Sequence, residues 1–197
     1  HWWSYHDRRI LFFLVPAKLL TGSMPRAALL EKYSLSEYIP LVNATRTGNL
    51  SQFRQTLQEH QELFVKQGIF LILEKLKLQV YRTFFKQMYE RAREVEWLSV
   101  DHRSTDTLHW LRSPSYLYLG RHKGAKLDLK VFGNALSWAG NEMELEEVEC
   151  VLATLIYKGY IKGYIAHDRG ALVLSKDNPF PAVRALQHPI VAGGRAA

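Results

Sequence analysis

The sequence contains a single cysteine, Cys150, among its 197 residues. One cysteine cannot form an internal disulfide, so a small secreted domain held together by disulfides is excluded. A buried, unreactive thiol is the simplest interpretation of Cys150. The sequence therefore predicts a nuclear or cytosolic protein in a reducing compartment.

Long uninterrupted hydrophobic runs are also missing. The longest one, ILFFLVPAKLL, contains Pro16 and Lys18 and is shorter than the ~20 residues that span a bilayer. The chain begins HWWSYHDRR, with neither an initiator Met nor a basic and then apolar leader. We therefore expect no membrane partner, and we expect the chain to be a piece of a longer protein.

Motifs for catalysis, nucleotide binding and metal binding are scarce. The sequence has no GxxxxGK[ST] or GxGxxG loop. His102 and His109 lie near each other, but without a cysteine pair or an HExxH arrangement they are a weak zinc signal. The acidic residues and histidines of this region are Asp101, His102, Asp106, His109 and His122. We therefore expect surface histidines, and no enzyme, cofactor or metal site.

Positive charge, by contrast, is in excess. The chain has 26 Lys and Arg against 19 Asp and Glu, a formal charge of +7. Such a surplus favours a polyanionic partner, although many basic proteins bind no polyanion. Residues 1–88 hold 12 cationic and 6 acidic residues, whereas residues 127–197 hold 7 and 8. A nucleic-acid contact in the last third is therefore expected to need a second surface.

Amphipathic helices are expected over the first half of the chain. Short helices separated by Gly- and Pro-containing turns are predicted for residues 7–20, 25–33, 36–47 and 50–60. A longer helix begins at Gly68 and covers 26 residues, about 39 Å. Its apolar residues lie on two lines, so it is expected to pack on two sides as a spine between two layers.

The last third changes character. Helices are predicted for residues 129–139 and 144–158, followed by strands on either side of the turn Asp168-Arg169-Gly170. Helices followed by a β-hairpin predict a winged helix. The expected organisation is a helical-repeat part with its connecting helix (1–94), an irregular insertion (95–126), a winged-helix subdomain (127–178) and a flexible tail (179–197).

Five ordered segments resemble one known family. They are DRRILFFLVPAKLLTGSMP, GNLSQFRQTLQEH, GIFLILEKLKLQVYRTFFKQMY, LEEVECVLATLIYKGYIKGYIAH and LVLSKDNPFP. The chain is similar to PCI-domain proteins, and among them to the PCI subunit of the nuclear complex that couples transcription to messenger RNA export. A signalosome-associated PCI paralogue tied to splicing factors shares many of the same segments. Residues 95–126 depart from the family pattern, which joins the two parts by a shorter segment.

This resemblance implies a mainly α PCI fold, in which a helical-repeat array is joined by a long helix to a C-terminal winged helix with a small β-hairpin. It implies a non-enzymatic scaffold subunit that binds a second PCI-domain protein and a small, acidic, disordered subunit. It also implies a nuclear location, with the nuclear pore and the cytoplasm as further sites, and a basic platform formed by winged helices.

The hairpin carries the candidate nucleic-acid contacts. Its cations can neutralise phosphates, and Tyr160 and Tyr164 can stack on unpaired bases for ~1–3 kcal/mol per base. Alternatively, the tyrosines cover the sheet and the lysine stems extend over them into water. The predicted nucleic-acid-binding residues are Lys158, Lys162, Arg169, Lys176, Arg121, Lys123 and Lys126.

An unpaired strand edge on the same hairpin is a competing docking site, because exposed edges accept partner strands. The predicted partner-interface residues are Tyr160, Tyr164 and Ile165. The preceding helix lacks the Arg, Asn and Gln that read base edges, so contact with RNA or DNA is expected to be non-specific. A purely protein-binding scaffold remains the alternative, whereas a sequence-specific DNA regulator and a hydrolase have less support.

Overall fold

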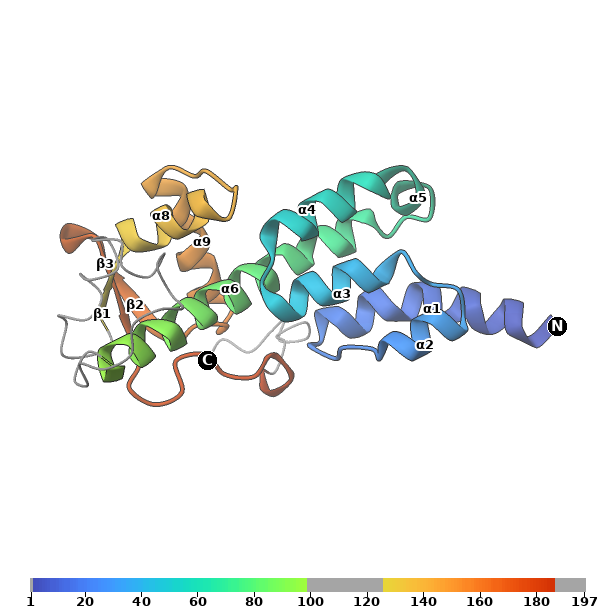
Figure 1. The fold of residues 1–197 in the computed structure, drawn as a ribbon, viewed down its shortest axis with the longest axis horizontal. Coiled ribbons are helices and arrows are strands. Elements are labelled where there is room, and N and C mark those ends of the chain that lie inside the picture. Colours follow the sequence, from blue (N-terminus) through green and yellow to red (C-terminus); the bar gives the residue numbers. More distant parts are fainter. Residues whose placement is uncertain (1, 99–125, 187–197) are drawn as a thin grey trace, which may run out of the picture.

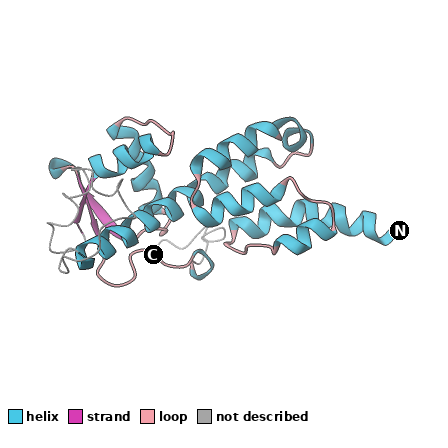
Figure 2. Ribbon diagram, viewed as in Figure 1, coloured by secondary structure: helices cyan, strands magenta, loops and turns pink. Residues whose placement is uncertain are grey.

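The computed structural model describes residues 2–98 and 126–186. Helices dominate these residues, and one three-stranded sheet lies near the far end of the molecule from the N-terminus (Figures 1 and 2). The predicted mainly α class is confirmed. Among the described helices, none combines the length and the hydropathy that a membrane span requires.

Five described helices form the first part of the chain. They are α1 (Trp2–Leu20), α2 (Ala27–Lys32), α3 (Tyr38–Thr47), α4 (Leu50–Glu59) and α5 (Gln61–Lys66). Gly48 ends α3 in a left-handed conformation, and the Asn49 side chain accepts a hydrogen bond from the Gln52 N–H at the start of α4. The four predicted short helices are therefore confirmed, with boundaries shifted by up to five residues, and α5 is a further helix that was not predicted.

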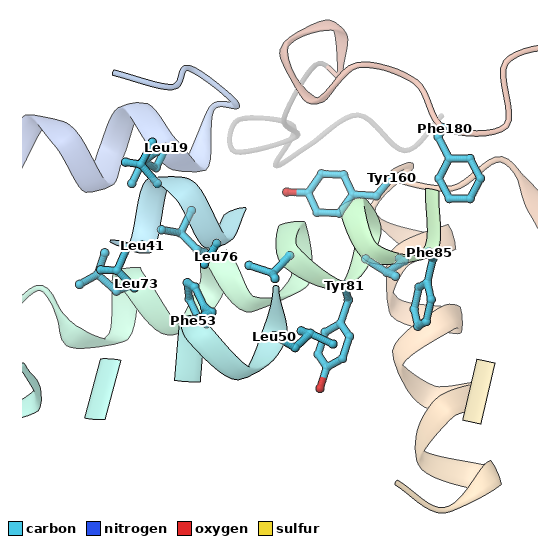
Figure 3. Close-up of a cluster of buried hydrophobic side chains, with 14 of the residues drawn as sticks. Leu19, Leu41, Leu50, Phe53, Leu73, Leu76, Tyr81, Phe85, Tyr160 and Phe180 are labelled. Carbon is cyan, nitrogen blue, oxygen red and sulfur yellow. The ribbon is translucent and has the colours of Figure 1, made fainter. Parts of the chain in front are cut away.

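Helix α6 (Phe70–Leu98) is the spine of the molecule and runs through both of its parts (Figure 1). It continues to Leu98, five residues beyond the predicted end at residue 93, because neither proline nor glycine interrupts it. We define the array as α1–α5 with the first half of α6. Leu73 and Leu76 of α6 are buried in its core. Further along, the Phe85 ring packs edge to face on Phe132 of α8 (Leu129–Trp138) at 5.0 Å (Figure 3 shows the core around Phe85). The predicted two-sided packing is confirmed.

The C-terminal unit contains two helices and a sheet. Its elements are β1 (Lys126–Asp128), α8 (Leu129–Trp138), α9 (Leu145–Tyr157), β2 (Gly163–Ala166) and β3 (Ala171–Leu174). The strands pair antiparallel in the order β1-β3-β2. The two helices and the hairpin agree with the sequence prediction, whereas β1 is an additional strand that the sequence does not predict. Three residues are too few to show a strand pattern.

Residues 179–186 pack against the protein, so the predicted flexible tail is wrong for this segment, which we call the strap. Phe180 is 6% exposed, and the Arg82 guanidinium donates hydrogen bonds to the carbonyls of Phe180 and Pro181. The Lys162 N–H donates to the Pro179 carbonyl at 2.8 Å. The small and proline-rich composition suggested disorder, but one buried aromatic ring and these hydrogen bonds hold the strap on α6.

Candidate nucleic-acid interface

The sheet has one buried and one more exposed face. Lys126, Val173 and Tyr164 lie directly opposite one another on the three strands, so their side chains share a face. Tyr164 is 61% exposed there. Leu127 and Leu172 point to the other face and are buried in the core. The exposed face therefore places an aromatic ring and a lysine on the same cross-strand row.

The cations of the hairpin lie at its two ends, with lysines at the open end and Arg169 at the turn. The register pairs Gly163 with Leu174 at the open end, so Lys162 and Lys176 lie there. Arg169 belongs to the turn at the opposite end, a strand length of about 13 Å away. Alternation along the sequence could not show this separation, because it depends on which residues the two strands pair.

Three exposed lysines gather at the open end, and we call Lys158, Lys162 and Lys176 the hairpin base. Lys158 caps the C-terminus of α9, four residues before Lys162. The Ser175 N–H donates to the Lys162 carbonyl at 2.8 Å and so brings Lys176 beside it. Within residues 2–98 and 126–186, none of the three lysines forms an ion pair. Their charge is available to a polyanion.

Tyr160 is buried, which corrects its assignment as a stacking and partner-interface residue. Gly159 has φ 71°, and after it the chain turns Tyr160 toward α6, leaving the ring 6% exposed (Figure 3). Burial raises the pKa of the Tyr160 phenol, and a hydrogen bond with the Gln79 side chain opposes that shift. Tyr160 therefore belongs to the core between α6 and the hairpin.

The remaining predicted residues have different surroundings. Tyr164 is exposed, whereas Ile165 is half-buried opposite Leu172 on the inner face of the sheet. Lys126 is half-buried on β1, and Arg121 and Lys123 lie outside the described residues. The edge of β2 that faces away from β3 has no partner strand in the described sheet.

The histidine-rich region also lies outside the described residues, so the prediction for His102, His109 and His122 stays a prediction. In the part of the chain that is described, no three His, Cys, Asp or Glu side chains are grouped to hold a metal ion.

Negative charge gathers at the start of α9, at the end of the helix opposite Lys158. Glu146 and Glu147 lie in its first turn, and the segment LEEVECVLATLIY contains no Lys, Arg, Asn or Gln. Together with α8, this end borders an open depression of about 710 Å³ whose lining includes Glu142 and Glu144. Cys150 is exposed on α9, so the prediction of a buried thiol is wrong. This helix is poorly suited to phosphates or to base edges.

One link between α9 and the hairpin was not visible in the sequence. The Nδ1 atom of His167 lies 2.8 Å and 3.0 Å from the two carboxylate oxygens of Glu149. This hydrogen bond, and then the charge of Glu149, raises the pKa of His167 above its usual value. The two residues are 18 positions apart, so only the fold brings them together.

Comparisons with known proteins cover most of the chain. No family model matches it. Enhanced ethylene response protein 5 of Arabidopsis thaliana is 39% identical over 174 residues, which are 88% of this chain and 36% of that protein. PCI domain-containing protein 2 of Xenopus laevis is 38% identical over 177 residues, 89% of this chain and 37% of its own length.

A further relative comes from the second group that the sequence resembles. Protein CSN12 homolog of Mycosarcoma maydis is 37% identical over 183 residues, 89% of this chain and 36% of its own length. The chain thus spans about a third of the length of the curated relatives that it matches. Because relatives named for the PCI domain match about 90% of its residues, the chain belongs to the PCI-domain proteins.

Proposed function

We propose that the chain is the PCI part of a non-enzymatic scaffold subunit of a nuclear messenger RNA export complex. PCI-domain proteins are generally scaffold subunits of protein complexes. The five-segment resemblance supports the export assignment. The proposed partners are a second PCI-domain protein and a small, acidic, disordered subunit, and we propose that α8, α9 and the hairpin act as a winged helix.

The observation that carries a nucleic-acid role is the exposed sheet face beside the hairpin base. The lysines of the base offer charges to phosphates, and Tyr164 offers a ring on which an unpaired base can stack. The acidic start of α9 disfavours insertion into a duplex groove. The proposed contact is therefore independent of sequence and prefers single strands of RNA or DNA.

The test is fluorescence anisotropy of a labelled single-stranded RNA over a series of salt concentrations. A variant with Lys158, Lys162 and Lys176 changed to Glu is expected to bind at least tenfold more weakly. Loss of three phosphate contacts makes the negative slope of log K against log salt shallower by about 2. An Arg169→Glu variant, altered at the other end of the hairpin, is expected to lose at most one contact. Equal binding by the triple variant and the unchanged, folded protein contradicts the proposal.

A purely protein-binding scaffold of a signalosome- or splicing-associated complex is the second candidate. The match to the CSN12 homolog and the unpaired edge of β2 favour it. It predicts no RNA binding at moderate salt, both for this chain alone and for its complex with a second PCI-domain protein. The export proposal predicts that such a partner increases the affinity for RNA, so the same titration separates the two candidates.

A further inference from the structure

A second group of cations lies at the turn between α1 and α2. Lys18 is in the last turn of α1, and Arg26 is the N-cap residue of α2. Arg184 reaches this turn from the strap and donates to the Gly22 carbonyl at 3.1 Å and to the Ser23 hydroxyl at 3.2 Å. All three cations are exposed, and no ion pair involves them within the described ranges. We call Lys18, Arg26 and Arg184 the corner.

The strap connects the hairpin base to the corner. It begins at Pro179, whose carbonyl is hydrogen-bonded to Lys162, and Arg184 follows five residues later. Five residues of extended chain span at most about 18 Å. Figure 1 shows this segment, in red, passing from the hairpin side of α6 to the end of α1. The strap contains no acidic residue, and the carboxylate next to it in sequence is Asp177, beside Lys176.

We propose that the hairpin base, the strap and the corner form one track for single-stranded nucleic acid, with the corner as its second contact surface. The inference rests on the proposed function and assigns the second half of the same site. Residues 127–197 carry no net surplus of positive charge, whereas the array does, so a strand held at the base gains most by continuing toward the array. The track offers six cations, equivalent to a salt slope of about −4 for a single strand.

An acidic protein segment is the other polyanion that such a track could hold. The exposed ring of Tyr164, on the same sheet face as Lys126, favours nucleic acid, because it can stack on a base but gains little from a carboxylate. The strap spans at most about 18 Å, a length that a 20-mer exceeds and that a 3-mer held at the base does not cover. The length of the bound strand is therefore the variable that tests the track.

The experiment compares labelled oligouridine RNAs of 3 and 20 nucleotides in the same anisotropy titration. The corner variant is Lys18→Glu with Arg26→Glu, which leaves the hydrogen bonds of Arg184 in place. The control variant is Lys66→Glu with Lys75→Glu, an equal charge change near α5. The corner variant is expected to bind the 20-mer at least fivefold more weakly, with a salt slope smaller by about 1.4. It is expected to bind the 3-mer, which is too short to reach the corner, within twofold of the unchanged protein. The control variant is expected to bind both RNAs within twofold of the unchanged protein.

The other results separate the two proposals. If the corner and control variants bind the 20-mer equally well, the track is wrong, while contact at the hairpin base stands. If the base triple variant binds the 3-mer as well as the unchanged protein does, the proposed function itself fails. If a 20-residue polyglutamate peptide displaces the 20-mer better than unlabelled RNA does, the track takes an acidic protein and the inference is overturned.

Discussion

The array and the C-terminal unit build their cores in different ways. In the array, helices that are consecutive or nearly so pack on one another and on α6, as α3 and α4 do. In the C-terminal unit, β1 pairs with β3 across more than 40 residues of sequence, and β3 is central only because of that pairing. Packing between neighbouring helices produces a periodic apolar pattern in the sequence. Pairing between distant strands produces no such pattern from which the partner strand could be predicted.

The two regions are nevertheless joined over a broad junction. Arg54 of α4 donates to the Gly140 carbonyl at 2.7 Å, and Asn141 donates to the Tyr81 hydroxyl at 3.1 Å. The strap adds a hydrogen bond from Arg82, the residue that follows Tyr81 on α6, to the Phe180 carbonyl. Because α6 contributes to both cores, disturbing the junction is expected to affect both regions together.

The largest expected effect comes from breaking this junction at its aromatic pair. Phe85 is fully buried on α6 and contacts Phe132. Phe85→Ala is expected to lower the free energy of unfolding by about 3–5 kcal/mol. Urea unfolding followed by circular dichroism measures this change. Leu71→Ala, on the same helix but at a 69% exposed position, is the control and is expected to change stability by less than about 0.5 kcal/mol. Equal effects of the two substitutions would show that Phe85 does not couple the regions.

The next largest loss of stability is expected from a substitution at a glycine of the array. Gly48 has φ 66°, and a Cβ atom there would lie 2.6 Å from the Phe84 backbone nitrogen of α6. Gly68 has a similar φ of 71°, but a Cβ atom there would meet nothing within 4 Å. Gly68→Ala is therefore expected to lower the free energy of unfolding only by the strain of placing alanine in a left-handed backbone conformation, about 1–2 kcal/mol. Gly48→Ala is expected to cost about 1–3 kcal/mol more because of the clash with α6. If thermal unfolding shows equal losses, α3 can move away from α6 without cost.

The smallest expected effect concerns the link between α9 and the hairpin turn. Because the folded-state pKa of His167 is raised, its contribution to stability is present below its unfolded pKa of about 6.5 and is lost as the pH rises through the folded-state pKa. Glu149→Gln is expected to lower the His167 pKa toward its ordinary value, as an NMR titration of the imidazole can measure. Asp168→Asn, which removes a weaker influence, is expected to lower it less. An unchanged pKa in Glu149→Gln would mean that the pair does not form in solution.

Much of the fold could be predicted from the sequence, and less of the candidate site. The helices of the array, the spine and the hairpin were visible because their apolar periodicity and turn residues are local. The strap was missed because one ring, Phe180, anchors a segment whose average composition suggests a tail. Tyr160 was misplaced because a left-handed glycine before it turns the ring into the core.

The helical class of the array, the hairpin, the excess of positive charge and the resemblance to PCI-domain proteins can be read from the residues alone, because composition and short-range periodicity are local properties of the chain. Which cations share a surface depends instead on the folded arrangement. The pairing of β2 with β3 sets Lys162 and Lys176 apart from Arg169, and the strap brings Arg184 to the turn after α1. Charges act through space, so their grouping depends on strand register and chain path rather than on their order in the sequence.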